Sequence, residues 1–109
     1  MIKELKILTA QRAVTAAGTP EMIKEAPEFT QNKVISITIR ALEANTGDTY
    51  VVYGDDRATA ATTGYILAPG EALTLDVSKF ADAYLDLSKI WIDAATNANA
   101  ICYVAFEVI

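Results

Sequence analysis

The segment Val34-Ile35-Ser36-Ile37-Thr38-Ile39-Arg40-Ala41 decides the fold class, because apolar and polar side chains alternate along it. Side chains of a β-strand point alternately to the two faces of a sheet. The alternation predicts one face made of Ile35, Ile37, Ile39 and Ala41 and another made of Ser36, Thr38 and Arg40. Helical spacing does not reproduce this pattern. The segment therefore predicts a strand with one buried and one exposed face.

The carboxy-terminal run from Ala100 to Ile109 predicts a second strand of similar length. One face would carry Cys102, Val104, Phe106 and Val108, and the other Ile101, Tyr103, Ala105 and Glu107. Both faces are mostly apolar, so we expect this strand to lie centrally in its sheet. We expect Val104, Phe106 and Val108 to supply core burial, and Cys102 to be a buried small hydrophobic residue.

Shorter strands are predicted wherever β-branched and aromatic residues are enriched between turn signals. They are Leu5–Thr9, Ala13–Ala16, Thr49–Tyr53, Tyr65–Leu67, Ala72–Val77 and Lys89–Ala94. The pair Pro69-Gly70 predicts a type II turn, since proline suits its second position and glycine its third. Helical spacing occurs only at Ser78–Leu87, where we expect a short crossover helix or turn with Ser78 as a candidate cap.

About eight short strands separated by regular turns are typical of a β-sandwich or small barrel, and we favour the sandwich. The predicted fold is all-β: an antiparallel sandwich of jelly-roll or immunoglobulin-like type with one short helical turn. A length of 109 residues suits one domain spanning 1–109. Residues 1–12 would form an N-terminal arm or an edge strand.

Charge and hydropathy exclude several classes of partner. The net charge of −5 and the scattered basic residues argue against nucleic acid, whose phosphates require clustered Lys and Arg. No apolar run approaches the roughly 20 residues that span a bilayer, and no basic segment precedes an apolar stretch at the amino terminus. We therefore expect a soluble protein made in the cytoplasm.

Catalytic chemistry has few candidates, because the chain contains no histidine and one cysteine. Histidine-based catalysis, an internal disulfide and a Cys-rich zinc site are therefore excluded. Gly54 and Gly64 do not form a phosphate-binding loop, since no Lys-Ser/Thr pair follows them. We expect no catalytic residue, no cofactor and no bound metal.

Carboxylates and aromatic residues leave two weaker hypotheses open. The acidic residues Asp48, Asp55, Asp56, Glu71 and Asp76 would suit a hydrolase or a calcium site, although they lack the spacing of an EF-hand loop. A sugar-binding platform would use Tyr50, Tyr53, Tyr65, Tyr84, Tyr103 and Trp91, which otherwise fill cores or interfaces. The small-residue segment Arg57–Gly64 predicts either a contact arm or a linker.

The amino-terminal segment Met1–Thr9 is a candidate for assembly, because an apolar cluster lies at a terminus where disorder is the default. Its apolar residues are Ile2, Leu5, Ile7 and Leu8. Two interpretations remain open: an edge strand within one subunit, or a strand that pairs with a neighbouring subunit or with another protein. Closed cyclic symmetry would accompany the second.

The order of these elements resembles that of small virion proteins of tailed bacteriophages. The resemblance rests on Ala16–Pro20, Val34–Ala41, the Ala44-Asn45-Thr46-Gly47 turn, Tyr50–Asp55, Gly64–Glu71, Leu85–Ala94 and the closing apolar strand. It covers nearly all of the chain after about residue 13. Tyr53 is an extra residue before Gly54, and Trp91 replaces the commoner tyrosine; neither departure affects the fold argument.

The resemblance implies a non-enzymatic structural subunit of a virion. Such a subunit would decorate the capsid or form a head-associated fibre, collar or adaptor, as a homo-oligomer bound to major capsid or head–tail proteins. It would bind neither nucleic acid nor membranes. A carbohydrate- or host-surface-binding module is the alternative, and a carboxylate-dependent hydrolase is a third hypothesis.

Overall fold

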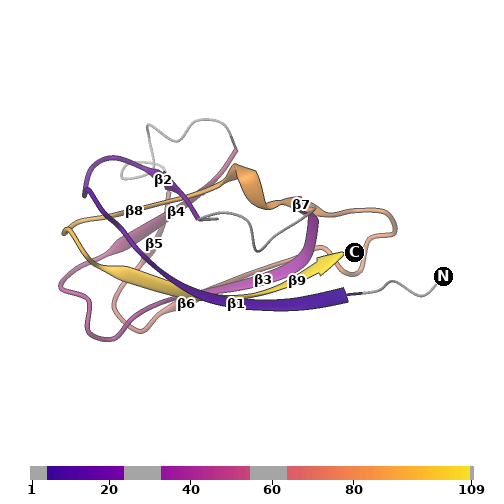
Figure 1. Ribbon diagram of the computed structural model, residues 1–109, viewed down its shortest axis with the longest axis horizontal. Coiled ribbons are helices and arrows are strands. Elements are labelled where there is room, and N and C mark those ends of the chain that lie inside the picture. Colours follow the sequence, from indigo (N-terminus) through magenta and orange to yellow (C-terminus); the bar gives the residue numbers. More distant parts are fainter. Residues whose placement is uncertain (1–4, 24–32, 55–63, 109) are drawn as a thin grey trace.

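The computed structural model describes residues 5–23, 33–54 and 64–108, which form mainly antiparallel β-structure (Figure 1). The strands are β1 (Leu5–Ala13), β2 (Glu21–Met22), β3 (Lys33–Ala41), β4 (Thr49–Tyr53), β5 (Tyr65–Leu67), β6 (Ala72–Asp76), β7 (Leu85–Asp86), β8 (Ile90–Ala94) and β9 (Ala100–Val108). Within these ranges the helical element is the short 3-10 helix η2 (Leu87–Lys89). No helix among the described residues is long and apolar enough to cross a membrane.

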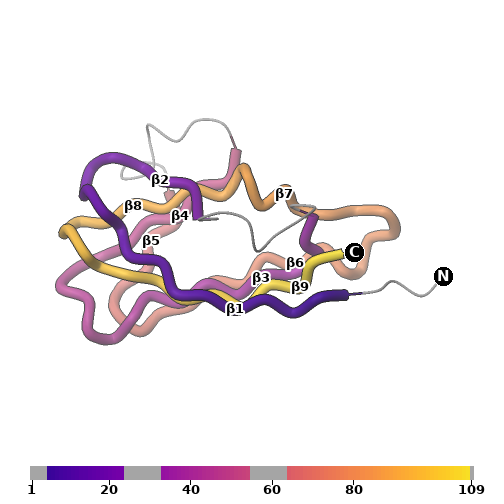
Figure 2. Tube along the Cα trace, viewed as in Figure 1, coloured from indigo at the N-terminus to yellow at the C-terminus, as the bar shows by residue number. Residues whose placement is uncertain are grey.

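The strands form two sheets that pack face to face. Sheet A has the order β1-β9-β3-β6, with β7 also paired to β3, and sheet B has the order β2-β8-β4-β5. Apart from β7, the pairs are nested: β1 with β9, β2 with β8, β3 with β6 and β4 with β5. This nesting is that of a long hairpin rolled into a jelly roll (Figure 2). The predicted antiparallel β-sandwich is confirmed, and its topology is the jelly roll.

Strand β3 supplies the middle of the core through Ile37, Ile39 and Ala41, all fully buried as predicted. The prediction for Ile35 is wrong, since that residue is only half-buried. The register with β9 shifts between Val34 and Ser36. A β-bulge inserts one residue and so reverses the alternation before it. Val34 consequently lies in the core, with no exposed surface.

Strand β9 lies between β1 and β3, which confirms its predicted central position. Its core face holds Ile101, Tyr103 and Ala105. The expectation that Val104, Phe106 and Val108 supply the core burial is wrong. Val104 remains 39% exposed, because it points away from the inner face on which sheet B packs. The apolar residues of this second face are therefore available for contacts outside the sandwich.

One predicted strand is absent, and one segment predicted as a helix or a turn is a turn. The strand expected at Ala13–Ala16 is absent, because β1 ends at Ala13 and the chain then turns; the N–H of Thr19 donates to the carbonyl of Ala16 at 3.1 Å. At Ser78–Leu87, where we expect a short crossover helix or a turn, the structure has turns: the N–H of Phe80 donates to the carbonyl of Val77 at 3.0 Å, and Asp82 adopts a positive φ of 63° that interrupts a helix.

Two predicted strands, Thr49–Tyr53 and Tyr65–Leu67, are confirmed at both ends, as β4 and β5. The other boundaries shift: β1 extends to Ala13, four residues beyond the predicted end at Thr9, while β6 ends at Asp76 and β8 begins one residue later than predicted. The turn at Pro69-Gly70 is confirmed as type II. Gly70 has φ of 86°, and the N–H of Glu71 donates to the carbonyl of Ala68 at 2.9 Å.

Candidate interaction surfaces

The outer face of sheet A, opposite the core, carries a row of apolar side chains, which we call the apolar stripe. The stripe consists of Leu5 and Ile7 on β1 and of Val104, Phe106 and Val108 on β9. The two strands are in register, with Leu5 opposite Val108 and Ile7 opposite Phe106. Leu5 is 43% exposed and Ile7 63% exposed. Val104 is exposed as well, whereas Phe106 and Val108 are half-buried. An exposed apolar surface of this kind is a candidate contact site for another molecule.

The same face becomes polar towards β3 and β6. Its side chains there are Ser36, Thr38, Arg40, Thr74 and Asp76. The hydroxyl oxygens of Thr38 and Thr74 lie 3.0 Å apart and share a hydrogen bond across the strands. Arg40 forms an exposed ion pair with Glu43 at 2.7 Å. The outer face is therefore amphipathic, with its apolar side next to the edge strand β1.

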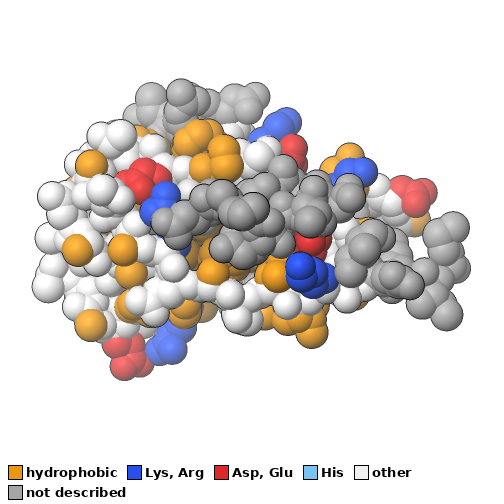
Figure 3. Space-filling model, viewed as in Figure 1, with side chains coloured by type: hydrophobic (Ala, Val, Ile, Leu, Met, Phe, Trp, Pro, Cys, Tyr) orange, Lys and Arg blue, Asp and Glu red, His pale blue; other side chains and the backbone are white. Residues whose placement is uncertain are grey.

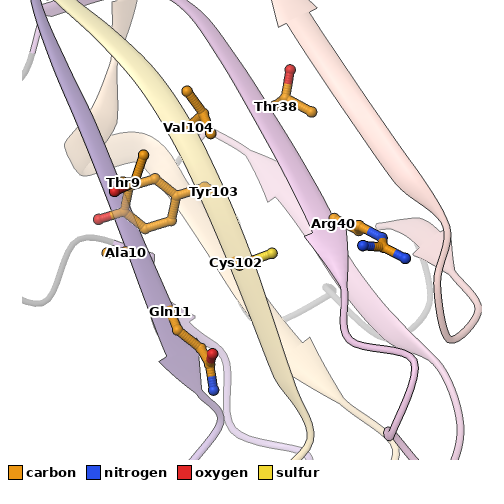
Figure 4. A pocket seen from close by; sticks show the side chains of 8 residues that line it. All are labelled: Thr9, Ala10, Gln11, Thr38, Arg40, Cys102, Tyr103 and Val104. Carbon is orange, nitrogen blue, oxygen red and sulfur yellow. The ribbon is translucent and has the colours of Figure 1, made fainter.

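A shallow groove of about 530 Å³ crosses this face between β1, β9 and β3 (Figure 4). Its lining includes Thr9, Gln11, Thr38, Arg40, Cys102 and Val104. In Figure 4, Cys102 lies between Gln11 on one side and Arg40 on the other. The expectation that Cys102 is a buried core residue is wrong, because it is half-buried on the outer face.

The acidic residues of the hydrolase and calcium hypotheses do not converge in the described part of the chain. Asp55 and Asp56 lie outside the described residues. The carboxylate of Glu71 accepts from the N–H of Ala68 at 2.7 Å and closes the turn there. No cluster of three His, Cys, Asp or Glu side chains able to hold a metal occurs among residues 5–23, 33–54 and 64–108.

Asp76 has a local structural role at the end of β6. Its carboxylate accepts from the backbone N–H of Ser78 at 2.8 Å. The hydroxyl of Ser78, together with this N–H, lowers the pKa of Asp76 below its ordinary value. The side chain is exposed, so this bond shapes the turn after the strand and does not form a buried site.

The aromatic residues of the sugar-binding hypothesis are distributed over separate regions. Tyr103 lies in the core with 5% exposure. Tyr53 accepts a hydrogen bond from the N–H of Asp86 at 2.9 Å, and the ring of Tyr84 lies 4.9 Å from the amine of Lys33, both near β7. Tyr50 and Trp91 share the outer face of sheet B. The six residues therefore do not form one platform, but these last two remain neighbours.

Tyr50 and Trp91 are neighbours because of the register of β4 and β8. Trp91 on β8 lies opposite Val52 on β4, and Asp93 on β8 lies opposite Tyr50 on β4. Tyr50 and Trp91 are therefore diagonal neighbours on the same face of sheet B. Diagonal neighbours on one sheet face lie about 7–8 Å apart, within reach of aromatic side chains. Ile66, on β5 opposite Tyr50, extends this surface and is 54% exposed.

Buried polar residues that the sequence analysis did not single out form hydrogen bonds with the backbone of the loops at one end of the sandwich. Asp93 is 1% exposed and accepts from the N–H groups of Gly18 and Ala94 at 2.9 and 2.8 Å. The amide oxygen of Asn99 accepts from the N–H of Thr46 at 3.1 Å. Asn45 is bonded to both backbone groups of Ala100. These contacts are structural, since each side chain satisfies the backbone of a neighbouring loop.

A partly buried ion pair joins β1 to β2. The guanidinium of Arg12 lies 3.0 Å from Glu21, whose other oxygen accepts from the N–H groups of Thr15 and Ala16. Burial opposes ionisation of Glu21, but these N–H groups and Arg12 outweigh it and lower its pKa below the ordinary value. The pair thereby holds the turn between the two sheets.

Glu107 is the buried acidic residue of β9, with no exposed surface. It lies between Lys6 of β1 and Val34 of β3 in the register of sheet A. The period-two pattern placed it on the same face as Ile101 and Ala105, so the sequence held the signal for its position. On the face shown in Figure 3, acidic and basic side chains are interspersed.

Comparisons with known proteins bear on the fold alone. No family model matches the chain, and no curated protein matches it. A solved structure of Bacillus endospore appendages, described as a family of disulfide-linked pili, is similar to it in fold with a TM-score of 0.56. The sequence identity is 16%, and the match covers 100% of this chain and 92% of that one.

Proposed function

We propose that this chain is a non-enzymatic structural subunit of a bacteriophage virion, either a capsid decoration protein or a head-associated fibre, collar or adaptor subunit. The observation that supports this role most strongly is the apolar stripe on sheet A. Its exposed residues lie on regular, paired strands, so the surface is rigid before contact. A preorganised apolar surface loses little conformational entropy when a partner covers it. Its occupant is a major capsid or head–tail protein.

The similarity to a pilus subunit supports an assembly role in general terms, because the jelly roll there serves a structural protein. The disulfide linkage described for those pili does not carry over directly to this chain. These 109 residues contain one cysteine, Cys102. Each subunit of a disulfide-linked chain needs two thiols to bond two neighbours, whereas one thiol bonds a single partner. A continuous chain of these 109-residue subunits would therefore need non-covalent contacts in addition to any disulfide at Cys102.

A carbohydrate- or host-surface-binding module is a second candidate, favoured by the adjacent Tyr50 and Trp91 on sheet B. Aromatic faces contribute apolar contact area and stack on the faces of rings. Trp91 is the only tryptophan in the chain, so its fluorescence reports directly on this surface. Quenching by a glycan, lost on Tyr50→Ala substitution, would favour this role over the structural one.

Co-sedimentation with purified phage heads tests the structural role. The test variant is Ile7→Ser combined with Val104→Ser, and the matched control is Thr74→Ser on the polar side of the same face. Burial of a residue of this size contributes about 1.5–3 kcal/mol, so the double variant should bind at least about tenfold more weakly. The control should bind normally. Wild-type protein that does not bind heads, or a double variant that binds equally well, would contradict the proposal.

A further inference from the structure

Sheet A ends in two strand edges that no other described strand covers. One edge is β1, with nine residues, and the other is β6, with five. An edge strand presents backbone N–H and C=O groups that can pair with a strand of another chain. The two edges lie on opposite sides of the same sheet, so one subunit offers two separate pairing sites.

The hydrogen bonds identify the backbone groups at the edge of β1. The N–H of Leu42 donates to the carbonyl of Ala100 at 3.1 Å, on the β3 side of β9. Backbone groups of an antiparallel strand alternate between its two neighbours, so Ile101 and Tyr103 bond towards β1. Their register partners are Arg12 and Ala10. The backbone groups of the alternate residues of β1 therefore point away from β9; these residues are Leu5, Ile7, Thr9 and Gln11.

The same reasoning applies to β6. The N–H of Ala41 donates to the carbonyl of Glu71 at 2.9 Å. Alternation then directs the backbone groups of Leu73 and Leu75 towards β3. Those of Ala72, Thr74 and Asp76 point outward. Each edge thus offers donors and acceptors at every second residue, as an antiparallel ladder requires.

The strand directions allow antiparallel contact between unlike edges. Three successive antiparallel pairings, β1 with β9, β9 with β3 and β3 with β6, make β6 run opposite to β1. A second copy in the same orientation beside the first therefore presents its β6 antiparallel to β1. The sheet formed by the two copies is then antiparallel throughout, as sheet A is within one subunit.

Charge complementarity favours unlike edges. Strand β1 carries two basic residues and no acidic one: Lys6, and Arg12, which also pairs with Glu21 of its own subunit. The segment from Glu71 to Asp76 carries these two acidic residues and no basic one. Pairing of β1 with another β1 would bring like charges together, whereas pairing of β1 with β6 brings opposite charges together.

The core provides a third argument. Leu8 on β1 and Leu73 and Leu75 on β6 pack against the buried core but are only partly buried. If Thr9 lies opposite Thr74 of a second copy, Leu8 lies opposite its Leu75 and Ala10 opposite its Leu73. The contact then covers, at both edges, the core-facing leucines that one subunit leaves partly open, which removes apolar surface from water.

From these three observations we infer that β1 of one subunit pairs antiparallel with β6 of a second copy of this chain, head to tail. Repetition of this contact produces a closed ring or an open filament. The inference deepens the structural role proposed above by naming a partner for each edge, and it rests on that role. Its test uses no phage heads, so the two proposals can fail separately.

The test is light scattering on full-length protein and two proline variants, Thr9→Pro and Thr74→Pro. Each substitution removes an outward N–H and spares the ladder within the sheet. Wild-type protein should have a mass of several times 11.7 kDa, and each variant alone should be monomeric. A mixture of the two variants should form pairs, because Thr9→Pro retains an intact β6 and Thr74→Pro retains an intact β1. Thr9→Ala, which keeps the N–H, is the matched control and should behave as wild type.

Several results would overturn the inference. Wild-type protein that is monomeric at about 1 mM would exclude a contact of useful affinity. Dimers of Thr74→Pro alone would indicate that two β1 strands pair. Hydrogen exchange of the wild-type protein tests the contact without any substitution. The amides of Ile7, Thr9 and Thr74 should become protected as concentration rises, and equal exchange at low and high concentration would refute the pairing even if a proline variant failed to fold.

Discussion

The substitution Ile101→Ala, compared with Val104→Ala, tests which face of β9 forms the core. Both residues lie on the same central strand, three positions apart, and both are β-branched. Ile101 has no exposed surface, whereas Val104 is 39% exposed on the outer face. Because both residues are apolar, the sequence pattern alone predicts a similar loss of stability for the two substitutions. The structure predicts different losses, so the comparison tests the structural assignment.

The expected magnitudes follow from burial. Replacement of a fully buried isoleucine by alanine costs about 2–5 kcal/mol, because it removes methyl groups and leaves a cavity between the sheets. Replacement of Val104 removes two carbon atoms from a partly exposed position, at about 0.8 kcal/mol for each fully buried CH₂. We expect a cost of about 1 kcal/mol or less. Against a total stability of about 5–15 kcal/mol, the first change is large and the second small.

Urea denaturation followed by circular dichroism measures both costs as shifts of the midpoint at constant slope. Ile101→Ala should lower the free energy of unfolding by at least about 1 kcal/mol more than Val104→Ala does. Equal losses, or a greater loss for Val104→Ala in a protein confirmed as monomeric, would refute the assignment of Ile101 to the core. Measurement at low protein concentration separates the effect from any contribution of assembly.

Three further predictions concern the strand end, metals and pH. Deletion of Phe106–Ile109 should leave the chain unfolded or aggregated, since it removes the pairing of β9 with the start of both β1 and β3; cooperative melting at the wild-type temperature would contradict this. Excess EDTA should leave the thermal midpoint unchanged, and a fall restored by calcium would indicate a site that includes Asp55 and Asp56. Glu21→Gln should destabilise the protein at pH 7 by about 1–3 kcal/mol, because an ionised acceptor is lost. Since the pKa of Glu21 is lowered on folding, its stabilisation is present above the ordinary value of 4.5 and is lost as pH falls through the folded pKa. The difference between variant and wild type should therefore shrink below pH 4.5, and a difference independent of pH would contradict the role of this carboxylate.

Parts of the candidate surfaces could be predicted from the sequence. The period-two pattern of β9 separated Ile101, Tyr103 and Ala105 from Val104 and Phe106, and this separation is correct. The pattern did not indicate which set faces the core, because both sets are apolar. Cys102 was assigned wrongly for the same reason. The polar contacts of Asp93 with Gly18 had no local signal, since the two residues are distant in sequence and meet only when the sheets pack.

The sequence by itself determined the β class, most strand positions, the turn at Pro69-Gly70 and the central place of β9, because each depends on side-chain alternation or on the backbone preferences of a few adjacent residues. Only the tertiary structure decided the jelly-roll pairing, the bulge that buries Val34, and the exposure of the apolar stripe. These features depend on which strands meet across long separations in the chain and on the placement of sheet B against one face of sheet A. The alternation of side chains along a strand indicates which faces are apolar, but the packing of the other sheet determines which apolar face is removed from water.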